Sequence, residues 1–212
     1  MASDTKAALA RIARLSDRCF GCATPLGWPG LIVMTDQERL GDAMAVLEKL
    51  PAGAALCMRD YTIPDRGEIA ARLAKRSRER GIRFLVGADV HLAIAVNAWG
   101  VHMPEGLWRT RPLEIGLAKR RGLKVTTAVH SRVAAHRAVS GGLEFGCDAM
   151  IVSPVFPTAS HRDAKALGPT GFELITRDIP VPAYALGGVN LNSIRWLRHT
   201  SAAGVAGISF AN

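Results

Sequence analysis

Four of the six histidines fall at or just beyond the ends of apolar segments: His91, His102, His130 and His161. An imidazole titrates near neutral pH, so one that faces a cleft can accept a proton and return it. His130, which ends the run KVTTAVH, is the candidate acid–base residue. A hydrogen-bonded structural role is the alternative for any one of these histidines. Their spacing does not indicate a metal cluster.

Two glycine-containing segments late in the chain have the form of a phosphate site. ALGGVN places Gly187 and Gly188 between an apolar run and a helix start, and AGISF places Ile208 and Ser209 after the last apolar run. Exposed backbone amides in such loops bind phosphate in many α/β barrels. The alternative is that the paired glycines only form a tight turn.

A third polar segment, SPVFPTASHRDAKALGPTG at residues 153–171, follows the apolar run AMIVSPVF. Thr158, Ser160, His161, Arg162 and Lys165 stand close together between prolines and glycines. Side chains of this kind bind anions, so the segment is interpreted as a binding loop, with a plain connector as the alternative.

The four cysteines fit a reducing compartment. Cys19 and Cys22 form a lone C-x-x-C with no second pair at zinc spacing, and they precede the first predicted strand. A metal or redox role is therefore not favoured. Cys57 and Cys147 lie within apolar runs and are predicted to be core residues.

These residues are positioned by short apolar segments that alternate with helical patterns. Apolar residues on nearly every position predict strands buried on both faces, and the alternation predicts a parallel sheet with right-handed crossovers. Strands are expected within residues 31–36, 54–60, 83–89, 99–104, 124–131, 149–156, 182–188 and 205–211, and helices within 39–50, 65–81, 113–122, 131–146 and 190–200.

Eight such units predict a single-domain (β/α)₈ TIM barrel over residues 30–212, with its site at the carboxyl ends of the strands. An open doubly wound sheet is the alternative, but no G-x-G-x-x-G loop follows an early strand. Residues 1–29 form an N-terminal extension with an amphipathic helix at 5–16. No closing helix follows the eighth strand, so the extra helix or a second subunit is expected to cover that gap.

Composition limits the partners. Of 212 residues 49% are hydrophobic, and 27 Lys and Arg against 18 Asp and Glu give a net charge of +9. The charge favours anionic ligands, but it is dispersed without interleaved aromatic residues, so nucleic acid is not expected. No long apolar window or signal-peptide pattern occurs, which predicts a cytoplasmic protein without a membrane partner.

Several motifs together resemble the thiamine phosphate synthase and TenI (thiazole tautomerase) family. They are LIVMTD, MRD, GVHM, VHS, the loop SPVFPTASHRDAKALGPTGFELI, ALGGV and GISFAN, and they cover about residues 30–212. The resemblance implies a (β/α)₈ barrel, usually a homodimer, that acts on a thiazole phosphate in thiamine biosynthesis. It also implies that Gly187, Gly188, Ile208 and Ser209 bind the phosphate, with Thr158, Ser160 and His161 in the strand-six loop.

The sequence departs from the synthase pattern where that pattern holds pyrophosphate and Mg²⁺. Of a strand-two Gln-x-Arg-x-Lys only Arg59 is retained, and Tyr61 replaces the lysine. The strand-three Asn-Asp falls on Gly87 and Ala88, and a serine of strand five falls on Ala128. His161 stands where a lysine is usual.

The weak candidates for a metal ligand are Asp89, one residue after the expected pair, and Glu105. A departing pyrophosphate requires cations to stabilise its charge, and Mg²⁺ prefers carboxylate oxygens. No cofactor is therefore expected, and Mg²⁺ is expected only if the protein is a synthase.

The resemblance and these departures together favour a TenI-like enzyme, in which His130 transfers protons and Arg59 binds the carboxylate or phosphate of the substrate. The first alternative is a thiamine phosphate synthase that joins an aminopyrimidine pyrophosphate to a thiazole phosphate. The second is a non-catalytic barrel that binds a phosphate-bearing ligand.

Overall fold

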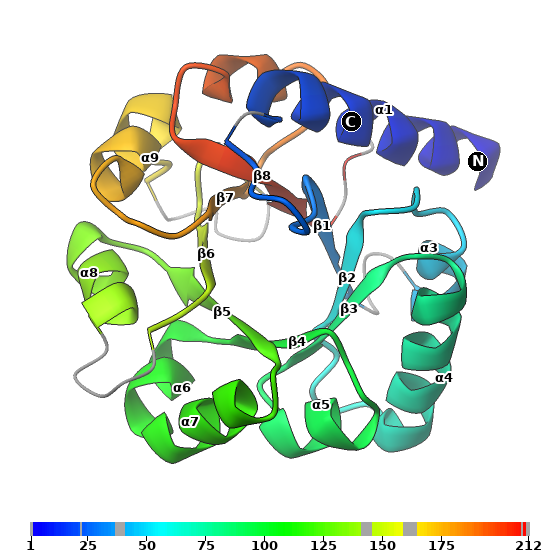
Figure 1. Ribbon diagram of the computed structural model, residues 1–212. Coiled ribbons are helices and arrows are strands. Elements are labelled where there is room, and N and C mark those ends of the chain that lie inside the picture. Colours follow the sequence, from blue (N-terminus) through cyan, green and yellow to red (C-terminus); the bar gives the residue numbers. More distant parts are fainter. Residues whose placement is uncertain are drawn as a thin grey trace.

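The computed structural model describes residues 2–21, 23–36, 41–140, 146–158, 165–208 and 210. Eight parallel strands form a closed barrel in sequence order, with β1 paired to β8, as predicted (Figure 1). The strands are β1 (Leu31–Met34), β2 (Ala55–Met58), β3 (Arg83–Gly87), β4 (Gly100–Met103), β5 (Lys124–Val129), β6 (Ala149–Val152), β7 (Ala183–Leu186) and β8 (Ala202–Gly207).

Burial on both faces explains why the strand sequences are apolar throughout. Every residue of β1, β2, β4, β6 and β8 is buried. Alternate residues face the barrel interior, where Ile32, Met34, Cys57 and Ile151 belong to one cluster, while the others pack under the helices. The prediction that Cys57 and Cys147 are core residues is confirmed.

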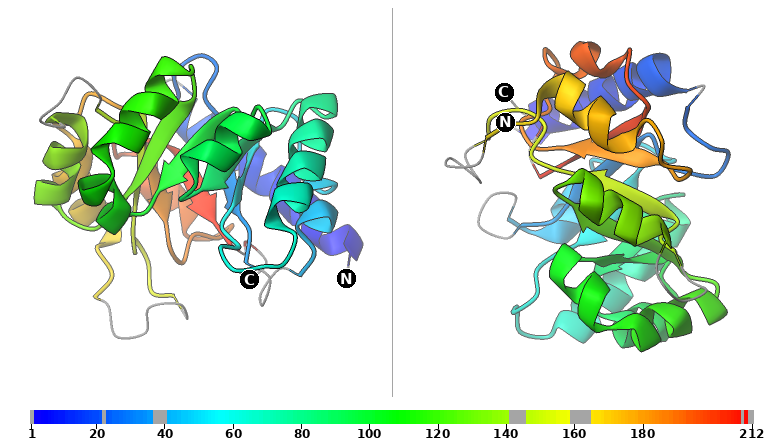
Figure 2. Two further views of the ribbon diagram at one scale, coloured as in Figure 1. Left: turned by 90° about the horizontal axis from the view of Figure 1, so that it is seen from below. Right: turned by 90° about the vertical axis from the view of Figure 1, so that its left-hand side faces the viewer.

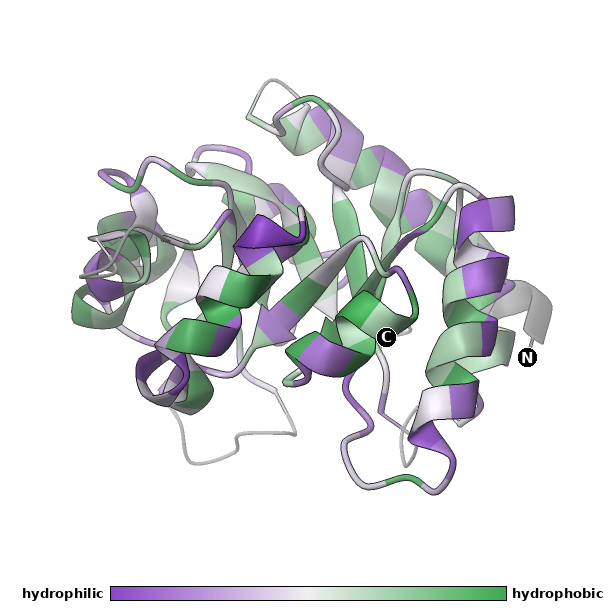
Figure 3. Ribbon diagram, turned by 60° about the horizontal axis from the view of Figure 1, so that its bottom comes forward, coloured by the Kyte–Doolittle hydropathy of each residue, from purple (hydrophilic) through white to green (hydrophobic). Residues whose placement is uncertain are grey.

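Helices surround the barrel (Figures 1 and 2). On α4 the hydrophobic residues, among them Ala70 and Leu73, face the strands, and hydrophilic residues lie on the outer side (Figure 3). None of the helices in the described residues is long and apolar enough to cross a membrane. The helices are α1 (Ala2–Phe20), α3 (Ala43–Leu47), α4 (Arg66–Glu79), α5 (Val90–Ala95), α6 (Glu105–Thr110), α7 (Pro112–Arg120), α8 (Arg132–Ser140), α9 (Gly168–Thr176) and the 3₁₀ helix η2 (Ile194–Leu197).

Four helical segments differ from expectation. The helix predicted at 190–200 is only the single turn η2. Before it lies a turn in which Asn190 Oδ1 accepts hydrogen bonds from the amides of Asn192 (2.9 Å) and Ser193 (3.0 Å). The short helices α5, α6 and α9 are not among the predicted elements. The helix α8 begins after Ser131, whose hydroxyl accepts from the amide of Ala134 at 3.2 Å and caps it.

The N-terminal helix α1 covers the seam between β8 and β1. It is longer than predicted, and its buried Leu9, Ile12 and Phe20 join the core. Ser16 on this helix donates a hydrogen bond to the carbonyl of Gly30 at 2.6 Å, just before β1. Residues 208 and 210, which follow β8, belong to no helix. The extra helix therefore covers the gap, as one of the two predicted options.

Aromatic residues fill the amino-terminal end of the barrel. Trp28, which precedes β1, and Trp99, which precedes β4, meet edge to face with ring centroids 5.1 Å apart, and Tyr184 of β7 lies 6.4 Å from Trp28. Aromatic rings therefore line the amino-terminal end of the barrel, opposite the carboxyl ends of the strands.

The buried hydroxyl of Tyr184 generates a stability prediction. The Tyr184 side chain is 0% exposed, and its hydroxyl has no hydrogen-bond partner in the described part of the chain. Because an unsatisfied buried hydroxyl costs about 1–3 kcal/mol, Tyr184→Phe is expected to raise the free energy of unfolding by about 1 kcal/mol. Urea denaturation measures the change.

The matched control is Thr176→Val, which removes a buried hydroxyl that does have partners, the Phe172 carbonyl (3.0 Å) and the Ser201 hydroxyl (2.7 Å). This variant is expected to lose stability. A loss in Tyr184→Phe equal to that of the control would contradict the prediction.

Candidate functional site

The mouth at the carboxyl ends of the strands collects the residues predicted from the sequence. Because all eight strands are parallel, the segments that follow them lie at one end of the barrel. Ser160, His161 and Ser209 lie outside the described residues, and so does Cys22. The described candidates are Arg59 after β2, Asp89 after β3, Glu105 after β4, His130 after β5, Thr158 after β6, Gly187 and Gly188 after β7, and Ile208 after β8.

Arg59 is held by hydrogen bonds between neighbouring loops. Its backbone amide donates to the hydroxyl of Thr35 at 2.9 Å, and that hydroxyl donates to the carboxylate of Asp60. The guanidinium Nη1 lies 3.6 Å from the sulfur of Met34, a residue of the barrel interior. The cation is therefore directed over the interior rather than toward the surface.

Next to this cation lies His102, a histidine to which sequence reasoning gave no specific role. Its Nδ1 is 3.0 Å from the hydroxyl of Thr126 on the next strand, and the residue is 4% exposed. Burial, and then the charge of Arg59, lower the pKa of His102 to about 3. The imidazole is thus neutral at physiological pH and adds polarity to the interior without adding charge.

His130 has its backbone and one ring nitrogen fixed. Its amide donates to Glu105 Oε2 at 3.1 Å, and its Nδ1 lies 2.8 Å from the carbonyl oxygen of Ser153. Because a carbonyl only accepts, Nδ1 carries the proton in the neutral ring and Nε2 keeps its lone pair. The Ser153 hydroxyl is a second neighbour of Nδ1, at 3.3 Å. Glu105 is a positioning residue in this arrangement.

Asp89 and Arg66 join the corner between β2 and β3. Asp89 Oδ1 accepts from the amide of Leu92 at 2.8 Å and caps α5, while its Oδ2 is 3.3 Å from Arg66 Nη1. Arg66 also donates to the carbonyl oxygens of Gly87 (2.7 Å) and Asp60 (2.9 Å). Ala88, which stands between Gly87 and Asp89 in the chain, adopts a left-handed conformation with φ of +61°.

Gly187 and Gly188 both have positive φ, +96° and +63°. The loop after β6 packs directly on them: a Cβ on Gly188 would lie 2.4 Å from the carbonyl oxygen of Pro157, and one on Gly187 would lie 3.0 Å from Cα of Pro154. Glycine is required at both positions for this close approach. The loop that carries Thr158 thus rests on the turn after β7.

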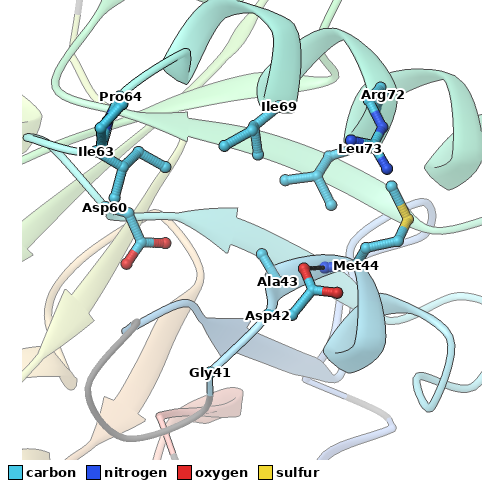
Figure 4. Close-up of a pocket in the computed structure, with 10 residues that line it drawn as sticks. All are labelled: Gly41, Asp42, Ala43, Met44, Asp60, Ile63, Pro64, Ile69, Arg72 and Leu73. Atoms are coloured by element: carbon cyan, nitrogen blue, oxygen red, sulfur yellow. Dashed lines mark hydrogen bonds between the residues drawn. The ribbon is translucent and has the colours of Figure 1, made fainter.

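A cavity of about 480 Å³ lies outside the barrel, between α3, α4 and the segment after β2. Its walls are mostly apolar, with Met44, Ile69 and Leu73 among them, and the carboxylate of Asp60 points into it (Figure 4). Asp60 therefore faces this cavity while it supports the Thr35 hydroxyl that holds Arg59.

The structure thus defines a (β/α)₈ barrel with a polar mouth that contains an arginine and two imidazoles. The sequence model of the thiamine monophosphate synthase family (TMP-TENI) matches residues 31–211. The chain belongs to this family.

Individual relatives agree with that assignment. The chain is 30% identical over 183 residues to a thiamine-phosphate synthase of Pyrococcus horikoshii and 32% identical over 183 residues to that of Pyrococcus furiosus, with 84% of each chain covered in both cases. Among solved structures, the thiamine phosphate pyrophosphorylase from Pyrococcus furiosus superposes with a TM-score of 0.67 at 28% identity, covering 83% of both chains.

The two carboxylates named above as weak metal candidates both have other partners in the structure. Asp89 is committed to the α5 cap and to Arg66, and Glu105 to the His130 amide. Within the described ranges, no group of three or more His, Cys, Asp or Glu side chains is arranged to hold a metal ion. Mg²⁺ binding by Asp89 or Glu105 would therefore have to compete with these existing partners.

The neutral state of His102 predicts a pH-dependent stability. The unfolded state protonates this histidine near its ordinary pKa of 6.5, whereas the folded state excludes the proton down to about pH 3. The unfolded state therefore binds more protons in this window, and stability falls as pH falls below about 6.5, by up to about 1.4 kcal/mol per pH unit.

His102→Gln is expected to flatten that slope, because glutamine does not titrate. Urea denaturation at about pH 7 and about pH 5 measures it. The exposed His199→Gln serves as the control and should retain the slope of the parent protein. An unchanged slope in His102→Gln would show that the imidazole is protonated in the folded state.

Proposed function

We propose that the chain is an enzyme of thiamine biosynthesis that binds a thiazole phosphate and catalyses a TenI-like proton transfer on it. One observation carries the proposal: His130 donates Nδ1–H to the Ser153 carbonyl, which leaves Nε2 as a proton acceptor at the mouth. A thiazole carboxylate phosphate is the substrate class that such a reaction requires.

His130 performs both proton steps in this proposal. Nε2 takes a proton from one atom of the substrate, and the resulting imidazolium returns a proton to another, so the reaction is balanced without a further reactant. The Ser153 carbonyl stabilises the imidazolium through the Nδ1–H bond, and Glu105 holds the backbone in place.

The remaining candidates bind the substrate. The Arg59 guanidinium, fixed over the interior, pairs with the carboxylate. Backbone amides of the segments after β7 and β8, at Gly187, Gly188, Ile208 and Ser209, hold the phosphate, with Thr158, Ser160 and His161 from the loop after β6. No cofactor takes part, and the protein acts as a cytoplasmic homodimer.

A thiamine phosphate synthase is the second candidate. It is favoured by the names of the relatives from Pyrococcus, which cover 84% of this chain. Two observations argue against it. Asp89 and Glu105 already bond to backbone amides, and Tyr61 is uncharged where a synthase has a lysine, whereas a departing pyrophosphate requires concentrated positive charge. A barrel that binds a phosphate ligand without catalysis is the third candidate.

Substitution of His130 tests the proton transfer. His130→Ala is expected to lower kcat for proton exchange on a thiazole carboxylate phosphate by about 10²–10⁴-fold with a small change in KM, because a general acid–base contributes this much. Hydrogen–deuterium exchange of the substrate in D₂O, followed by NMR, measures the rate. The exposed His136→Ala on α8 is the control. Exchange at the parent rate in His130→Ala would remove His130 from the reaction.

A synthase assay separates the two enzymatic candidates. The protein is mixed with the aminopyrimidine pyrophosphate, the thiazole phosphate and Mg²⁺, and thiamine phosphate is measured by chromatography. The amount of thiamine phosphate is expected to equal that formed in a control mixture without protein. In the separate exchange assay, EDTA should leave the rate of proton exchange unchanged. Turnover that depends on Mg²⁺ would establish the synthase and reject the TenI-like proposal.

A further inference from the structure

We infer that Tyr61 and Arg59 together form a specificity site for a planar ring that carries one carboxylate, located where a synthase would place pyrophosphate and metal. The inference rests on the proposed function and assigns its substrate selectivity to the corner between β2 and β3. Tyr61 has no role in the proton transfer itself, and it is the residue that this inference adds.

The ring of Tyr61 covers the end of β3. Its Cε1 lies 3.0 Å from the position that a Cβ on Gly87 would occupy, and the residue is 44% exposed. One part of the ring is therefore packed against the backbone of Gly87 and the rest is open to solvent. An aromatic ring fixed in this way offers a ligand a rigid contact surface.

The end of β3 has no space for a side chain. A Cβ at position 87 would also approach the carbonyl oxygen of Met58 to 2.8 Å. The Gly87 carbonyl accepts from Arg66, and the next carboxylate along the chain, Asp89, pairs with the same arginine. The groups that a metal-bound pyrophosphate would require at this corner are thus absent or already bound to Arg66.

Arg59 lies next to this aromatic surface and has only uncharged contacts. Within the described ranges its guanidinium contacts the Met34 sulfur, and no ion pair with a carboxylate is formed. Arg59 and Tyr61 lie against the same strand end, because a Cβ on Gly87 would be 3.5 Å from Cα of Arg59 and 3.0 Å from Cε1 of Tyr61. Burial raises the pKa of the Tyr61 phenol, and the charge of Arg59 opposes that rise. The phenol is neutral and leaves the charge of Arg59 uncancelled.

A partly buried guanidinium beside a neutral imidazole and a neutral phenol suits a single carboxylate, which a planar guanidinium binds through two parallel hydrogen bonds. Of the two arginines described at this corner, Arg66 is paired with Asp89, which leaves the charge of Arg59 unpaired; one unpaired positive charge is too little for a pyrophosphate. The exposed part of the tyrosine ring fits the flat face of the heterocycle that bears the carboxylate. The corner therefore selects a heteroaromatic carboxylate.

Two ligands that differ by one group test the inference: a thiazole carboxylate phosphate and the thiazole phosphate that lacks the carboxylate. Isothermal titration calorimetry of the parent protein is expected to give a Kd about 10–100-fold lower for the carboxylate. In Arg59→Met the two ligands should bind with equal Kd. Tyr61→Leu should weaken both ligands about 10-fold, and Tyr61→Phe should weaken them less, because it keeps the ring.

Tyr184→Phe is the matched control, since it changes the only other tyrosine of the chain, at the opposite end of the barrel, and should leave both Kd values unchanged. Circular dichroism verifies that each variant is folded, and Tyr61→Phe provides a test if Tyr61→Leu does not fold. Equal Kd values for the two ligands in the parent protein, or full affinity in Tyr61→Leu, would overturn the inference, as would the absence of binding by either ligand.

Failure of the proposed function has a different signature. Suppose that the parent protein prefers the ligand with the carboxylate, that Arg59→Met removes this preference and that Tyr61→Leu weakens both ligands, but that no proton exchange is detected. The specificity site is then supported and the TenI-like reaction is rejected. If exchange occurs while Arg59→Met keeps the preference for the carboxylate, the reaction stands and the specificity site is rejected.

Discussion

The pairing of β1 with β8 is the constraint on which the mouth depends. It joins Leu31 to Val205 and Val33 to Gly207 and closes a sheet that would otherwise have two open edges. Once the sheet is closed and every strand is parallel, the segments after the strands converge on one opening, which brings together residues as distant in sequence as Arg59 and Gly188. The helix α1 protects this seam, because η2 is only one turn and leaves β8 poorly covered.

Much of this arrangement is predictable from the sequence, because burial on both faces leaves a continuous apolar run in each strand. The order of elements, the N-terminal helix and the strand-end positions of Arg59 and His130 follow from such runs. The single turn at 194–197 does not, because the pattern at 190–200 has the form expected of a longer helix. Helix patterns average over ten or more residues, so the six-residue α5 and α6 are weak signals.

The roles of the acidic residues were harder to predict. Asp89 was considered as a metal ligand, yet it stands directly before the apolar segment VHLAIA, and an aspartate in that position is a common helix cap. That signal was present in the sequence. The partnership of Glu105 with the amide of His130 had no such signal, because it joins loops 25 residues apart that meet only when the barrel closes. The hydrogen bonds that join Thr35 to Asp60 and to the amide of Arg59 likewise had no signal in the sequence.

The backbone conformation of Ala88 has a consequence for substitutions at this position. Its left-handed backbone is unfavourable for alanine, whereas aspartate and asparagine tolerate it because their short polar side chains bond locally. The loop holds this shape through the hydrogen bond of the Ala88 amide to the carbonyl of His102, at 2.8 Å, and not through its side chain. The backbone therefore keeps a shape that suits an aspartate better than the alanine it holds. A single substitution could place a carboxylate at this corner without moving the main chain.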